Sequence, residues 1–190
     1  MDTVEQILMG LALASAAGLR AFLPLLALAL GARFHLVPLN GHFAWLHSNT
    51  AIAVLAVATV AEVMADKIPL VDHALDAIQS VVRPLAGALA VASTQGHVDP
   101  VTAGVLGIIL GAPLAGGVHV VKGGTRLASS AATVGLANPF LSLGEDGTSL
   151  VISLLAIFVP VAACLLVLIM FYFGWRIWSR VRKLRKQPQV

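Results

Sequence analysis

Charged side chains are scarce in this chain. Asp, Glu, Lys and Arg make up 11% of its 190 residues and hydrophobic residues 58%, whereas soluble domains carry ~25% charged and ~45–50% apolar residues. The mean hydropathy is +0.93. These values exclude an ordinary soluble domain. They predict an all-α, polytopic transmembrane helix bundle, with room for about six spans of ~20 residues.

Cysteine is almost absent, since Cys164 is the only one. A single cysteine excludes an intramolecular disulfide and a cysteine metal cluster. Its neighbours, VAACLLVLIM, predict a small residue facing lipid or the core. The net charge of +3 comes mainly from the end of the chain, RIWSRVRKLRKQPQV. The basic residues therefore belong to a tail, and we expect no nucleic-acid partner.

Six apolar segments follow one another, and we expect each to form a helix. The first, residues 3–30, is expected to be kinked or broken around Arg20 and Pro24, because proline removes a backbone donor. A loop at 31–48 is expected to hold a short interfacial helix, with Trp45 among the headgroups and Asn49 as the next N-cap. The other segments are 49–66, 70–94, 101–122, a shorter 123–140 that begins with a hinge at Gly123 and Gly124, and 148–175.

The basic tail predicts an orientation. We divide the chain into a transmembrane domain, residues 1–175, and a basic cytoplasmic tail, residues 176–190, because cytoplasmic segments carry an excess of Lys and Arg. If all six segments cross, both termini are cytoplasmic, and the histidine-bearing loop and the Gly-Glu-Asp stretch at 144–146 face outward. The fifth segment is an alternative re-entrant helix, which would change this parity.

Two stretches resemble each other. ASAAGLRAFLPLLAL (14–28) and SSAATVGLANPFLSL (129–143) share small residues, then Gly-Leu, then a Pro, Phe and Leu cluster. One interpretation is an internal repeat that makes two related halves, as in transporters whose broken helices mark the substrate site. The alternative is a chance echo, because alanine, leucine and glycine dominate the composition.

The charge that is present gathers in EVMADKIPLVDHALDAIQSVVRP, residues 62–84. At helical spacing, Asp72, Asp76, Gln79 and Arg83 share a stripe about 60° wide. Leu75, Ile78 and Val82 fall on the opposite face. The stripe either lies at the cytoplasmic interface or lines a polar cleft inside the bundle. A dry core is disfavoured, because each charge at the bilayer centre costs roughly 2.5–3.5 kcal/mol.

A basic set follows. His119, Lys122 and Arg126 share one side if the helix runs through 119–133. Lys122 and Arg126 can then pair with Asp72 and Asp76. Arg20 has no acidic neighbour in the sequence. It therefore needs a carboxylate from elsewhere in the fold, such as Glu62 or Glu145, or else a hydrated pocket or an anionic ligand.

Three of these stretches, GLRAFLPLLALAL, ADKIPLVDHALDAIQSVVRPLAGAL and SSAATVGLANPFLSLGED, together resemble the bacterial integral-membrane proteins grouped as domain of unknown function 4126. The resemblance covers about residues 5–170. It implies a small multi-pass protein of the bacterial inner membrane and supplies no reaction.

We expect a transporter or translocator of a small solute, an ion or a lipid head group through a polar cleft, with no cofactor. A homodimer is expected, with the glycines of GVLGIILGAPLAGG as close-packing surfaces. The candidate cleft residues are Arg20, Pro24, Glu62, Asp66, Lys67, Asp72, His73, Asp76, Gln79, Arg83, His119, Lys122, Arg126, Asn138, Glu145 and Asp146.

Two other functions are alternatives. The first is an intramembrane enzyme, in which Asp72, His73 and Asp76 with Glu62 and Asp66 ligate a divalent metal. It is less favoured, because the chain has no HExxH or GxSxG motif. The second is a structural or regulatory membrane subunit whose charges fix helix packing and whose tail recruits a partner or anionic lipid.

Overall fold

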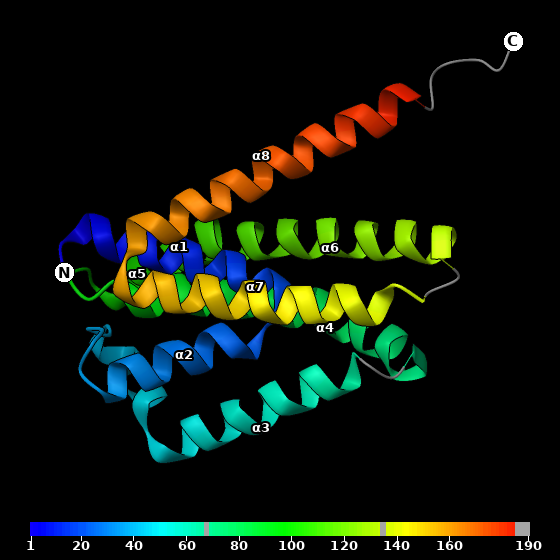
Figure 1. Ribbon diagram of the computed structural model, residues 1–190. Coiled ribbons are helices and arrows are strands. Elements are labelled where there is room, and N and C mark those ends of the chain that lie inside the picture. Colours follow the sequence, from blue (N-terminus) through cyan, green and yellow to red (C-terminus); the bar gives the residue numbers. More distant parts are fainter. Residues whose placement is uncertain (67–68, 134–135, 185–190) are drawn as a thin grey trace, which may run out of the picture.

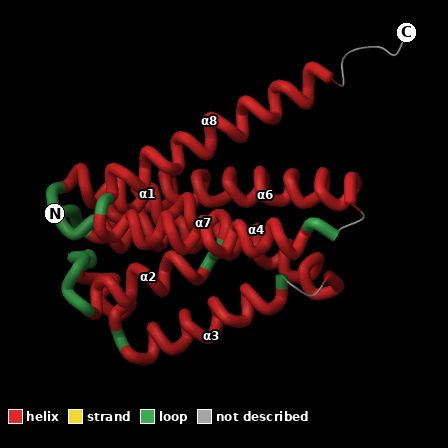
Figure 2. The backbone as a smooth tube through the Cα atoms, viewed as in Figure 1, coloured by secondary structure: helices red, strands yellow, loops and turns green. Residues whose placement is uncertain are grey.

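The prediction of an all-α fold is confirmed by the structure, a computed structural model that describes residues 1–66, 69–133 and 136–184 (Figures 1 and 2). Within these residues the chain forms eight α-helices, one 3₁₀-helix (η1), one π-helical turn (η2) and no strand. Their bounds are α1 Thr3–Leu19, α2 Phe22–Arg33, η1 Gly41–His47, α3 Asn49–Ala65, α4 Pro69–Thr94, α5 Pro100–Leu106, η2 Gly107–Gly111, α6 Ala112–Thr133, α7 Asn138–Phe158 and α8 Pro160–Leu184.

The first apolar segment is a helical hairpin rather than one kinked span. The chain reverses at Arg20, whose backbone is extended, so that the start of α1 and the end of α2 lie at the same end of the bundle (Figure 1). Hydrogen bonds fix this arrangement, because Gln6 and Asn40 both bind the loop after α4. The helix breaks at Arg20 because of Pro24, which lies in the first turn of α2. Pro24 has no N–H, and its ring would clash with the Arg20 carbonyl in a continuous helix.

The connection from α2 to α3 is ordered. His35 has a φ of 58° and ends α2 in the left-handed conformation, with its N–H bonded to Ala32 and the Leu36 N–H bonded to Gly31. Glycine is the usual residue here, and a side chain costs roughly 1–2 kcal/mol. The expected short helix is η1, and it meets α3 at 64°. The N-cap of α3 is Ser48, whose side chain accepts the Ala51 N–H, and not Asn49 as predicted.

Beyond α4, the structure replaces two predicted segments with one helix. Residues Pro100–Thr133 run as a single 34-residue helical stretch through α5, η2 and α6. Gly123 and Gly124 lie inside α6, so the predicted hinge and the separate fifth segment are wrong. A continuous helix keeps every backbone group bonded, which an apolar environment favours over a break at the glycines.

The last predicted span differs as well. The Gly-Glu-Asp stretch is not an outward-facing connector, because it lies within α7. The helix predicted for 148–175 is instead divided at Val159, where Pro160 begins α8. The end of α8 lies at the opposite end of the bundle from the start of α1 (Figure 1).

Glycines bring α1, α4 and the η2–α6 segment into close contact. A Cβ at Gly111 would lie 2.2 Å from the Gly87 carbonyl oxygen, and one at Gly107 would lie 2.4 Å from that of Ala88. These two glycines were predicted to serve a dimer contact, and they pack within the chain instead. Backbone-to-backbone packing through small residues is typical of helices in membranes.

Beside its apolar core, the bundle buries charged side chains and exposes large apolar ones, unlike an ordinary water-soluble protein. Arg20 and Arg83 are the largest fully buried side chains, whereas Val57, Leu127 and Phe140 are more than two-thirds exposed, at 71%, 72% and 76%. Two helices, Pro100–Thr133 and Asn138–Phe158, are long and apolar enough to cross a membrane, and the bent pair η1–α3 makes a third. The predicted six spans are therefore not confirmed by the described residues, which also include three shorter apolar helices, Thr3–Leu19, Phe22–Arg33 and Pro160–Arg176.

Replacing Gly111 with alanine tests the close packing. We expect Gly111→Ala to lower the free energy of unfolding by about 1–3 kcal/mol, because the new methyl group overlaps the backbone of α4. Gly117→Ala is the matched control on the same helix, since its Cβ meets open space; it should be neutral or stabilising by up to about 1 kcal/mol. Unfolding in detergent micelles measures both, and equal stabilities would contradict the packing described.

Candidate functional site

The reversal of the chain at Arg20 places this side chain at the centre of a buried ionic network. Its guanidinium pairs with Asp66, which follows α3, and donates to the Ser142 side chain on α7 at 2.8 Å. Asp146 lies within ion-pair distance of its Nε atom, although without hydrogen-bond geometry. The carboxylates that Arg20 lacks in its own sequence neighbourhood thus come from α3 and α7.

Asp66 also pairs with two cations of α6. Lys122 and Arg126 on α6 lie 3.4 and 2.9 Å from its Oδ2 atom, the same oxygen that pairs with Arg20. Lys122 and Arg126 also contact Glu145, at 3.0 and 2.9 Å. The second oxygen of Asp66, Oδ1, is buried and has no hydrogen-bond partner.

Glu62 completes the start of α2. Its carboxylate accepts the N–H groups of Ala21 and Phe22, at 3.0 and 3.3 Å, which have no partner within their own helix. A carboxylate at a helix N-terminus is also favoured by the helix dipole. Because Glu62 also lies 3.5 Å from Arg83, it joins the network to the backbone of the hairpin.

Cations complete the end of α1 in the same way. The Gly18 carbonyl accepts from Arg83 at 3.1 Å, and the Leu19 carbonyl accepts from Lys122 at 3.2 Å. Positive charge is favoured at a helix C-terminus. Both helix ends created by the reversal therefore face charges of the stabilising sign.

Arg83 connects the network to the polar stripe of α4. It contacts Gln79 one turn earlier on α4 and lies 2.9 Å from the Nδ1 atom of His119 on α6. Among the described residues the network holds equal numbers of each charge: Arg20, Arg83, Lys122 and Arg126 against Glu62, Asp66, Glu145 and Asp146. Formal neutrality lowers the cost of burying ions, which is several kcal/mol for each unpaired one.

The structure unites most of the predicted site residues. Lys122 and Arg126 pair with Asp66 and Glu145. Their predicted pairing with Asp72 and Asp76 concerns side chains outside the described residues, so it stays a prediction. Lys67 lies outside the described residues, and so do the side chains of Asp72, His73 and Asp76, whose backbone belongs to α4.

Pro24 and Asn138 stand apart from the ion pairs. Pro24 is buried in the first turn of α2, where it shapes the hairpin. Asn138 donates to Ser130 at 2.9 Å and so ties the start of α7 to α6.

Ser142 was missed by the sequence analysis. It is fully buried and carries no charge, so the distribution of charged residues did not indicate its role. A signal was present in the spacing, because Ser142, Glu145, Asp146, Ser149 and Ser153 follow one another at helical intervals. Reading the Gly-Glu-Asp stretch as a turn hid this polar face of α7.

A metal site is not evident in the part of the chain that the structure describes, which contains no group of three or more His, Cys, Asp or Glu side chains able to hold an ion. The proposed ligands Asp72, His73 and Asp76 fall outside that part.

The family model described as "Domain of unknown function (DUF4126)" matches residues 7–180. The chain belongs to this family. A search of the curated proteins found no match, and a search of the solved structures found none either. The family description carries no activity, so the function has to be inferred from the ionic network itself.

Removing the central carboxylate tests the network. We expect Asp66→Asn to destabilise the protein by about 3–5 kcal/mol, because three buried cations lose their shared counter-charge. Asp99→Asn is the matched control: Asp99 is an exposed N-cap of α5, and asparagine caps equally well. Chemical unfolding in detergent gives both values. A wild-type stability for Asp66→Asn would show that the pairing contributes little.

Proposed function

We propose that this protein is a small membrane transporter that moves an anionic solute or an ion, with the ionic network as its binding centre. The observation that carries the proposal is the convergence of Arg20, Lys122 and Arg126 on one oxygen of Asp66, beside a broken helix. Ionisable residues inside a membrane mark substrate and ion pathways, and broken helices mark transporter sites.

An anion can compete with Asp66 for the same cations. The three cations already face one negative oxygen, so a guest carboxylate or phosphate that takes its place leaves none of them unpaired. The displaced Asp66 carboxylate then needs water or a proton to offset its charge. Two buried donors without hydrogen-bond partners, Gln79 Nε2 and Arg83 Nε, are further points where an anionic guest gains bonds, and the unpaired acceptor Asp66 Oδ1 is a point where water does.

Depth in the bundle supports the same role. Glu145 and Asp146 lie seven and eight residues after Asn138, the first residue of α7, which corresponds to about 10–12 Å of helix. The side chains of Arg20, Arg83 and Lys122 are almost fully buried, so the network is closed in this conformation. A solute then reaches the network only if the α1–α2 hairpin moves. The hairpin is joined to the network by hydrogen bonds, which can be replaced by bonds to the solute or to water.

A structural role is the second candidate, and one observation favours it. Every cation of the network among the described residues has a carboxylate partner, and such pairing alone can hold α3, α4, α6 and α7 around the hairpin. In that case the network never opens.

The bacterial inner membrane as location, the cytoplasmic tail and a homodimer remain part of the proposal. The hairpin changes the predicted side of the N-terminus, which the sequence analysis placed in the cytoplasm. If the tail is cytoplasmic, the N-terminus faces the other side of the membrane, because α1 and α2 return to the end from which they started.

Ion flux tests the transport proposal. Proteoliposomes containing the purified protein, offered chloride, inorganic phosphate or acetate, should take up at least one of these anions faster than protein-free liposomes. Arg20→Lys keeps the charge but not the forked contacts, so the flux should fall about tenfold or more. Arg176→Gln, an exposed cation on α8, is the control. No flux of any probe through wild-type protein, together with destabilised network variants, would favour the structural role.

Cysteine labelling tests the orientation. Cys164 is the only native cysteine, so a Cys164→Ser background allows single reporters at Asp2→Cys and Gln189→Cys. A membrane-impermeant maleimide should label position 2 in cells whose outer membrane is permeable, and position 189 only after the inner membrane is opened. Labelling of both positions from one side would contradict the re-entrant hairpin.

A further inference from the structure

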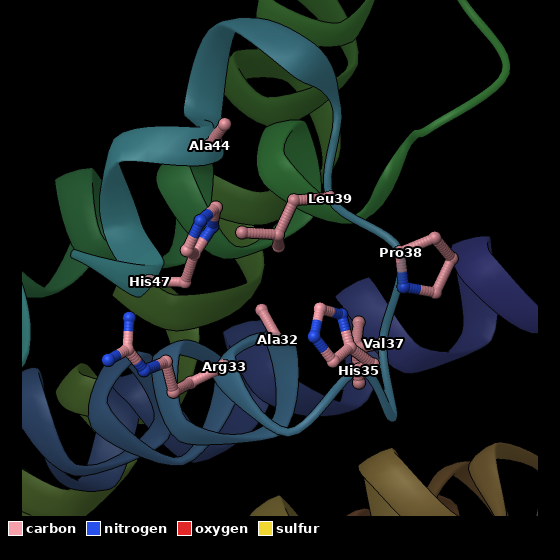
Figure 3. Close-up of a pocket in the computed structure, with 8 residues that line it drawn as sticks. All are labelled: Ala32, Arg33, His35, Val37, Pro38, Leu39, Ala44 and His47. Atoms are coloured by element: carbon pink, nitrogen blue, oxygen red, sulfur yellow. The ribbon is translucent and has the colours of Figure 1, made fainter.

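A second polar site lies away from the ionic network, where α2 ends. The last turn of α2, the following loop and η1 line an open cavity of about 400 Å³ (Figure 3). Arg33, His35 and His47 line it together with Pro38, Leu39 and Ala44. In Figure 3 the guanidinium of Arg33 extends toward His47, and the ring of His35 lies on the other side of the opening.

The charge of this cavity has one sign. Its lining contains no carboxylate, and the sequence has no Asp or Glu between Glu5 and Glu62. Arg33 therefore has no counter-charge in its own stretch of chain, in contrast to Arg20. A guanidinium and two imidazoles offer N–H donors from several directions, which is the chemistry that recognises a phosphate group.

The position of His35 adds to this reasoning. Its left-handed backbone is the one that glycine adopts most readily, and a histidine there directs its ring at the cavity. Backbone conformation alone would favour glycine at this position, yet the chain has a histidine there.

An apolar groove adjoins the cavity. Leu30, Phe34 and Leu36 from the same turn of chain, together with Leu150, Leu154 and Phe158 of α7, line a hollow of about 240 Å³. Residues 30–37 therefore form a wall shared by the two hollows. Arg33 and His35 face the cavity, and Leu30, Phe34 and Leu36 face the groove. Trp45 and Phe34 are exposed nearby, as expected for residues at the headgroup level.

We propose that the cavity binds the phosphate of an anionic phospholipid, one of whose acyl chains lies in the groove between α2 and α7. The positive cavity recognises the headgroup, and the apolar groove explains why the ligand is a lipid rather than free phosphate. This site is independent of the transport proposal and needs only a membrane around the protein.

Lipid binding by the purified full-length chain tests the proposal. Native mass spectrometry in detergent should show tighter binding of phosphatidylglycerol than of a diacylglycerol with the same chains, and little binding of inorganic phosphate. Arg33→Gln should weaken phosphatidylglycerol binding about tenfold or more, because it removes charge-assisted hydrogen bonds. Arg176→Gln removes an exposed charge elsewhere and should bind as the wild type does.

His35→Gly separates binding from folding. Glycine relieves the left-handed backbone, so this variant should unfold at an equal or higher temperature in lipid-free detergent while it binds phosphatidylglycerol more weakly than the wild type. Three results would overturn the proposal: unchanged binding by Arg33→Gln and His35→Gly, equal binding of diacylglycerol, or binding of inorganic phosphate as tight as that of the lipid. The flux measurement does not decide any of them.

Discussion

The fold depends on satisfying the backbone groups that the chain reversal at Arg20 leaves unpaired. In an apolar environment each such group costs several kcal/mol without a partner. Here Glu62 accepts the N–H groups that begin α2, and Arg83 and Lys122 donate to the carbonyls that end α1. The charges need the hairpin as well, since the same carbonyls offset part of their lost hydration. Hairpin and network therefore stabilise each other, and neither is expected to form alone.

Small residues make this arrangement possible. The network spans α4, α6 and the turn after α1, and its contacts require these helices to approach closely. At Gly18 a Cβ would lie 2.5 Å from the Ala115 carbonyl oxygen, and at Gly87 it would lie 2.5 Å from that of Gly111. The η2 turn lies at this same contact, where the helix follows the backbone of α4. The glycines thus set the helix spacing, and the spacing lets short ion pairs form between side chains far apart in sequence.

Composition and local pattern were enough to predict the helical fold and the unusual position of Arg20, because both follow from nearby residues. The carboxylate partners of Lys122 and Arg126 were not predictable, because the local sequence does not show which acidic side chains tertiary packing brings to them. Gly-Glu-Asp-Gly at 144–147 has the composition of a turn, yet its carboxylates face Arg20 and Lys122 from within a helix. Pairing in the bundle overrode local turn preference there, as continuous hydrogen bonding overrode the glycine pair in α6.

The absence of carboxylates between Glu5 and Glu62 affects cations at both ends of the bundle. Every cation in that stretch has to find negative charge outside it. Arg20 reaches into the bundle and obtains Asp66 and Asp146 from helices packed against the hairpin. Arg33, at the other end of α2, lies beside a cavity with no carboxylate in its lining. A neutralised cation thus precedes α2, and a cation open to an external anion ends it. This is the charge pattern expected if Arg20 belongs to the core of the protein and Arg33 to its contact with lipid headgroups.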